Sequence, residues 1–131
     1  MIDHLSIQVA DVPASVAFYD AVLAALGGTR QMEFQDVIAY GTDRPEFWLG
    51  PTTTGGTARE VHLAFTASDR AAVVAFHDAA VAAGAEVLHA PRLWPEYHPT
   101  YFAAFVRDPD GNNIEAVCHA PQQFDGEGGG R

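Results

Sequence analysis

The sequence predicts an α+β fold made of two tandem βαβββ modules. Three observations predict it. An alternating apolar segment is followed by a helical pattern, this unit recurs 58 residues later, and each copy ends in apolar segments joined by a turn-rich stretch. Two copies of about 55 residues are too few for a solenoid, which needs about three repeats, so the repeat favours a pseudo-symmetric pair.

The first module begins with a strand over residues 2–9, because Leu5, Ile7 and Val9 alternate with polar side chains. Asp11, followed by Pro13, is typical of the start of a helix. The helical spacing of apolar residues continues to the glycine pair at 27–28. Residues 30–34 are a weakly marked strand, and residues 39–49 contain two further strands around a turn.

The second module repeats this order. Residues 61–67 alternate as a strand, Asp69 precedes a helix, and Gly84 lies near the end of that helix. Apolar segments at 102–106 and 114–116 flank the run 108–111, Asp-Pro-Asp-Gly, which is a strong hairpin turn signal.

These elements predict a single domain over residues 1–121. Module 1 covers about residues 1–50, and module 2 about residues 60–121. A linker rich in threonine and glycine spans 51–59. The glycine-rich tail, 122–131, is expected to be disordered.

Composition excludes several classes of protein. The chain of 131 residues has 17 acidic and 7 basic side chains, a net charge of −10, which disfavours binding to nucleic acid or to an anionic membrane. The single cysteine, Cys118, rules out an internal disulfide and a cysteine zinc cluster. No apolar run is long enough to span a membrane and no secretory signal is visible, so we expect a cytoplasmic protein.

The doubled module resembles the vicinal oxygen chelate superfamily, which includes glyoxalase I, extradiol dioxygenases, and fosfomycin-resistance and bleomycin-binding proteins. The matching stretches are 2–19, 60–65 and 105–115, and the last carries the specific pattern Asp-Pro-Asp-Gly-Asn-Asn-Ile-Glu. The resemblance reaches to about Pro121 and is greatest to glyoxalase-like single-domain members. It implies a curved mixed sheet around a pocket, a small-molecule substrate or ligand, and a homodimer.

In such a fold the face opposite the apolar residues of each strand lines the pocket. Alternation therefore directs His4 and His62 into it, and Glu115 from the last strand. Two imidazoles and one carboxylate suit a divalent metal: Fe, Zn, Mn, Ni or Co. The resemblance assigns metal ligation to the same three positions. The alternative is that each histidine is a half-buried residue with a satisfied hydrogen bond.

One position departs from glyoxalase I. In that enzyme a second carboxylate comes from the last strand of the first module, where this chain has Trp48. Glu46 lies two residues away and could substitute for it. The substrate pocket is predicted to be lined by Trp48, Tyr97, Ser6 and Gln8.

The loop over residues 93–101 is aromatic and stiffened by two prolines. Its residues His98, Tyr97 and Tyr101 are candidates to donate hydrogen bonds or protons to a metal-bound substrate. The residues predicted to be catalytic are Glu115, His98 and Tyr101. The alternative is a rigid loop that covers a sheet edge or a dimer contact. His77 and His119 are expected to be surface residues.

The sequence thus favours a metal-dependent enzyme of the lyase, isomerase or dioxygenase type, acting on a small substrate with vicinal oxygens. The alternative is a metal-free protein that sequesters a cationic drug, as bleomycin-resistance proteins do. The acidic charge and the aromatic residues Trp48, Trp94 and Tyr97 suit that alternative.

Overall fold

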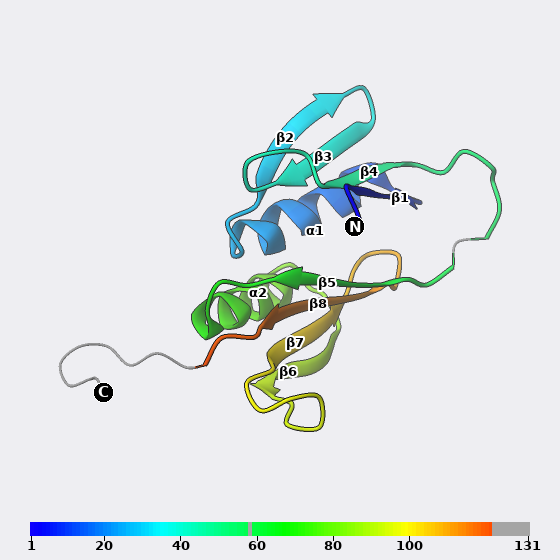
Figure 1. Cartoon of the computed structure of the whole chain (residues 1–131). Helices are drawn as coiled ribbons and strands as arrows, with labels where there is room; N and C mark the ends of the chain where they lie inside the picture. Colours follow the sequence, from blue (N-terminus) through cyan, green and yellow to red (C-terminus); the bar gives the residue numbers. More distant parts are fainter. Residues whose placement is uncertain (58, 122–131) are drawn as a thin grey trace.

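The computed structural model describes residues 1–57 and 59–121, and Figure 1 shows the course of the chain. The tail predicted to be disordered, 122–131, lies outside the described residues. Module 1 consists of β1 (Leu5–Val9), α1 (Val12–Ala24), β2 (Thr29–Phe34), β3 (Val37–Gly41) and β4 (Phe47–Pro51). Module 2 consists of β5 (His62–Thr66), α2 (Arg70–Ala82), β6 (Val87–Leu93), β7 (Phe102–Arg107) and β8 (Asn113–Cys118). The predicted α+β fold of two tandem βαβββ modules is confirmed.

Each module forms its own four-stranded mixed sheet, and the two sheets have the same topology. The strand orders are β1-β4-β3-β2 and β5-β8-β7-β6. The first strand of each module pairs in parallel with the last, and the remaining pairs are antiparallel. In consequence β1 and β5 are edge strands of their sheets.

Both helices begin at the aspartates that the sequence marks. The Asp11 carboxylate accepts a hydrogen bond from the Ala14 amide at 3.0 Å, and Asp69 accepts one from the Ala72 amide at 2.8 Å. Gly84 follows the end of α2 with a φ of 83°, a left-handed conformation that costs glycine little.

The two helices lie side by side between the sheets (Figure 1). One apolar core joins both modules, with contributions from α1, α2 and the helix-facing side of each sheet. The opposite side of each sheet, here called its outer face, points away from this core. The outer faces carry both polar side chains, such as His62 and Glu115, and apolar ones, such as Phe105 and Val117.

A polar contact ties the modules together. Asp108, in the turn before β8, is buried, and its carboxylate accepts four hydrogen bonds, one of them from the Tyr19 hydroxyl of α1 at 2.6 Å. Gly111 in the same turn has a φ of 85°. Burial and the neighbouring Asp108 raise the pKa of the Tyr19 phenol, which stays a hydrogen-bond donor. This contact fixes the hairpin that leads into β8.

No helix among the described residues is long and apolar enough to cross a membrane.

Candidate metal centre

The outer face of module 2 brings His62 and Glu115 together. In the parallel pairing of β5 with β8, Ala64 lies opposite Glu115, and His62 lies one residue pair further along on the same face. The His62 Nε2 atom is 3.0 Å from Glu115 Oε1. Glu115 is 2% exposed, whereas the His62 side chain is 50% exposed.

The hydrogen bonds of His62 define the state of its ring. The Nδ1 atom is 3.0 Å from the carbonyl oxygen of Asn113, which can only accept, so Nδ1 carries a proton. In a neutral ring Nε2 is then a lone-pair acceptor, and it faces a carboxylate oxygen, which is another acceptor. Two acceptors at this distance need a cation between them, either a proton or a metal ion. A metal-ligating histidine also characteristically donates its other N–H to a carbonyl or carboxylate.

Tyr101 completes the environment of the carboxylate. Its hydroxyl donates to Glu115 Oε2 at 2.5 Å. Burial, and then the adjacent Glu115 carboxylate, raise the pKa of the Tyr101 phenol above its ordinary value. Tyr101 therefore remains protonated at neutral pH and holds Glu115 in a fixed orientation.

His98 packs against Tyr101, which in turn donates a hydrogen bond to Glu115. The Thr100 amide donates to His98 Nδ1 at 3.2 Å, so the proton of a neutral His98 lies on Nε2, which donates to His119 Nδ1 at 2.7 Å. The rings of His98 and His119 each pack edge-on against Tyr101. His119, expected at the surface, is exposed, and it also contacts His98 and Tyr101 of the loop. His119 lies directly after the end of β8 and four residues after Glu115, a spacing that continues the alternation of Glu115 and could have indicated this contact.

The loop after β6 covers part of the outer face of module 2. Trp94, Phe105 and Val117 form a second apolar cluster with Ala103. The Trp94 indole N–H donates to the Ala103 carbonyl oxygen at 3.1 Å. Tyr97, predicted to line the pocket, stacks on Trp94 with 5.7 Å between ring centroids and is itself exposed.

Module 1 presents the remaining predicted site residues on its own outer face. Ser6 lies opposite Trp48 in the β1–β4 pairing, just as Ala64 lies opposite Glu115, so Trp48 occupies the position of Glu115. Ser6 and Gln8 are exposed. The Trp48 indole nitrogen is buried and has no hydrogen-bond partner.

His4 precedes β1 and contacts module 1 residues. Its Nδ1 atom is 2.7 Å from the Asp3 carboxylate, and its ring meets Trp48 edge-on at 6.3 Å. Asp3 accepts the Nδ1 proton, which leaves Nε2 as a lone-pair donor to a metal. Among the described residues of one chain, however, no group of three or more His, Cys, Asp or Glu side chains is arranged to hold a metal ion. One chain therefore brings together two of the three predicted ligands, His62 and Glu115, and His4 is not among them.

Comparisons with known proteins agree with the fold and the repeat. The family model of the Glyoxalase/Bleomycin resistance protein/Dioxygenase superfamily matches residues 1–116. A glyoxalase/bleomycin resistance protein from Albidiferax ferrireducens is 28% identical, with a TM-score of 0.79, over 88% of this chain and 97% of its own. A lactoylglutathione lyase from Agrobacterium tumefaciens shares the fold at 21% identity, with a TM-score of 0.67, over 90% of this chain and 92% of its own. No curated protein matches the sequence.

Proposed function

The chain belongs to the Glyoxalase/Bleomycin resistance protein/Dioxygenase superfamily, and on that premise we propose that it is a metal-dependent enzyme acting on a small substrate with vicinal oxygens. One observation carries the proposal. His62 Nε2 and Glu115 Oε1 are two acceptors 3.0 Å apart, with the other His62 nitrogen committed to a carbonyl oxygen. This donor set fits two positions of a divalent metal site.

The ligands we assign are His62, Glu115 and His4, and the candidate metals are Fe, Zn, Mn, Ni and Co. When bound, such a metal supplies Lewis-acid chemistry at the neighbouring oxygens of a substrate. Because His4 does not reach the other two ligands within one chain, we assign it to the site of a second copy. Two such sites would then form in a homodimer with a two-fold axis.

The edges of the sheets support this dimer. The strands β1 and β5 each have one unpaired edge, which is a template for pairing with another chain. Apolar side chains at these edges are exposed, namely Ile2, Leu5 and Val61. Pairing β1 of one copy beside β5 of the other would bury them and bring His4 toward the His62–Glu115 pair.

The protein's own residues then have separate roles. Glu115 is the group that accepts a substrate proton, and Tyr101 holds its second oxygen and is a protonated donor. His98, bonded to His119 beside Tyr101, lies on the solvent side and would exchange protons with water. Trp48, Tyr97, Ser6 and Gln8 are assigned to the substrate pocket. Trp48 cannot abstract a proton, and Glu46 lines the cavity between the modules, so we assign the abstraction of a substrate proton to Glu115. This assignment favours lyase, isomerase or dioxygenase chemistry other than that of glyoxalase I.

The first experiment is elemental analysis of untagged protein purified without nickel resin or chelators. We expect about one metal ion per chain, and its loss in both His62→Ala and Glu115→Gln. His77→Ala is the matched control, because His77 lies on α2 and contacts Asp78. Metal retained at full stoichiometry in His62→Ala would contradict the assignment.

A complementation experiment tests whether the site is shared. His4→Ala and His62→Ala should each lack metal as homodimers. Refolded together, they form heterodimers in which one site has lost both histidines and the other has kept both. Recovery of one metal ion per heterodimer is therefore expected. Failure to recover metal, with dimers verified by sedimentation, would contradict a site built across two chains.

The alternative function is that of a metal-free protein that sequesters a cationic ligand. The observation that favours it is the exposed Tyr97 ring stacked on Trp94 in a chain of net charge −10. If the protein takes up none of the five metals, and the His62→Ala variant binds ligands unchanged, this alternative replaces the enzyme.

A further inference from the structure

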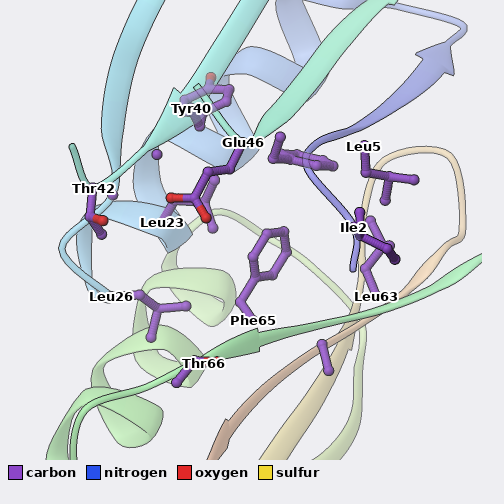
Figure 2. Close-up of a pocket in the computed structure, with 14 residues that line it drawn as sticks. Ile2, Leu5, Leu23, Leu26, Tyr40, Thr42, Glu46, Leu63, Phe65 and Thr66 are labelled. Atoms are coloured by element: carbon purple, nitrogen blue, oxygen red, sulfur yellow. The ribbon is translucent and has the colours of Figure 1, made fainter. Parts of the chain in front are cut away.

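A cavity of about 460 Å³ lies between the two modules (Figure 2). Leu63 and Phe65 border it from the helix-facing side of β5, and Ala64 and Thr66 of the same edge strand also line it. It is bordered by the end of α1, the start of β4, the edge strand β5 and the residues before β1. Its volume is within the range of pockets that hold small organic molecules. The proposed metal ligands are not among its lining residues.

The wall of the cavity is predominantly apolar. Leu23 comes from the end of α1 and Leu26 from the turn after it, Phe47 comes from β4, and Leu63 and Phe65 come from β5. Ile2 and Leu5 also line the cavity, and a dimer formed along β1 and β5 would cover them. Leu23 and Leu26 belong to neither edge strand, so this part of the wall does not depend on that dimer. A hydrocarbon group placed here would be removed from water on several sides.

The cavity has a single carboxylate. Among the described lining residues Glu46 is the one Asp, Glu, Lys, Arg or His, and the hydroxyls of Thr42 and Thr66 are further polar groups. The Tyr40 hydroxyl is bonded to Asp20. Figure 2 shows the Glu46 side chain reaching toward the space between Leu26 and Phe65.

The backbone holds Glu46 at this point. Its amide donates to the Tyr40 carbonyl oxygen at 2.8 Å, and its carbonyl accepts from the Leu5 amide at 2.9 Å. Gly41 allows the chain to turn tightly here, because a Cβ atom at that position would meet the Arg44 carbonyl oxygen at 1.8 Å. The Glu46 carboxylate is thus set on a constrained segment above an apolar wall.

We propose that this cavity binds a small apolar amine, with its ammonium group against Glu46 and its hydrocarbon part against Leu23, Leu26 and Phe65. Charge complementarity selects this class, because a carboxylate with no cation among the lining residues disfavours an anion and favours a cation. The net charge of −10 acts in the same direction. The proposal does not depend on the metal centre.

The test compares three probes of one shape: hexylamine, hexanol and hexanoate. Binding is followed by amide and methyl NMR shifts of the full chain, with shifts expected at Leu23, Leu26 and Phe65. Because Glu46 is exposed to solvent, the ion pair is worth at most about 1 kcal/mol, so hexylamine should bind up to about fivefold more tightly than hexanol. Hexanoate should bind most weakly.

Variants distinguish the contribution of the Glu46 charge from that of the shape of the cavity. Glu46→Gln should reduce hexylamine affinity to that of hexanol, whereas Asp36→Asn, which removes a carboxylate from the exposed β2–β3 turn, should not. Leu26→Phe should weaken all three probes by filling the cavity, provided that its thermal unfolding resembles that of the parent. His62→Ala should bind hexylamine unchanged, which distinguishes this site from the metal centre.

Three results would overturn the proposal. Equal affinity for hexylamine and hexanol would show that the cavity does not select amines. The absence of NMR shifts at the lining residues would show that the probes do not bind in this cavity. Shifts at these residues that follow dilution of the protein, and not addition of hexylamine, would mean that a second copy fills the space.

Discussion

The outer faces of the two modules share one backbone pattern and differ in chemistry. In module 2 the position opposite Ala64 carries Glu115, buried and bonded to His62 and Tyr101. In module 1 the position opposite Ser6 carries Trp48, whose indole N–H has no partner. Repetition of a fold therefore does not repeat a site, because the site depends on single side chains at matched positions.

The connections between the middle strands explain much of the difference. Residues 35–36 join β2 to β3, whereas residues 94–101 join β6 to β7. The longer loop supplies Trp94 and Tyr101, which pack over the outer face of module 2. Without such a loop, Phe34 and Met32 in module 1 are 66% and 48% exposed. The outer face of module 1 therefore has exposed apolar side chains, whereas the loop covers those of module 2.

The two tryptophans should respond differently to the same change. Trp94→Phe removes the donor of a buried hydrogen bond to the Ala103 carbonyl, which should cost about 2 kcal/mol of unfolding free energy. Trp48→Phe removes a buried donor that has no partner, and relief of its desolvation cost offsets the lost packing. The unfolding free energy should therefore stay nearly the same or rise slightly. Urea unfolding of both variants measures the contrast. Equal losses of stability would mean that the indole nitrogens do not distinguish the modules.

Tyr101→Phe tests whether the Tyr101 hydroxyl orients the Glu115 carboxylate. The variant keeps the ring but removes the hydrogen bond to Glu115 Oε2, so Glu115 is less well oriented. Metal affinity is expected to fall by about tenfold, a typical effect of an outer-shell partner. Competition titration with a metal-binding dye gives the affinity. Tyr97→Phe is the control, since Tyr97 lies in the same loop and contacts Tyr101 by its ring.

A substitution at Asp20 tests the polar network that links α1 to β2 and β3 of module 1. Asp20 accepts hydrogen bonds from Arg30 and Tyr40, and the Arg30 guanidinium, which outweighs burial, holds the pKa of the Asp20 carboxyl below its ordinary value. The unfolded chain therefore binds the proton more tightly. The stabilisation is present above the unfolded pKa and is lost as the pH falls through the folded pKa.

Asp20→Asn should consequently lower stability by about 0.5–1 kcal/mol at pH 7, a value limited by the partial exposure of the pair. The difference from the parent should shrink below about pH 4, where the unfolded carboxyl takes up its proton. Thermal unfolding of both proteins, measured from pH 2.5 to 7, gives this difference in stability. A difference that is independent of pH would show that the carboxylate charge is not the cause.

Much of the fold could be predicted because its signals are local. Alternation in residues 2–9 and 61–67, the caps at Asp11 and Asp69, and the turn at 108–111 all act over a few residues, and the structure contains each. The strand at Thr29–Phe34 is weakly marked in the sequence because most of its residues are polar and it packs against little of the core. Its two large apolar side chains, Met32 and Phe34, are exposed.

The site could be predicted less completely. Alternation assigns His62 and Glu115 to one face, but it carries no information on which sheet comes next to which, so the distance of His4 from that pair could not be foreseen. The link from Tyr101 to Glu115 depends on how the loop 94–101 folds back. The role of Glu46 beside the inter-module cavity likewise depends on the approach of β5 to α1.

The hydrogen bond between Tyr19 and Asp108 has a consequence for the cooperativity of the chain. Asp108 organises the hairpin of module 2, yet one of the four hydrogen bonds to its carboxylate comes from the helix of module 1. Detachment of module 1 would leave a buried carboxylate oxygen short of a donor and loosen the turn that leads to Glu115. This hydrogen bond therefore adds a cost to the separation of the two halves of the duplicated sequence and favours their unfolding together.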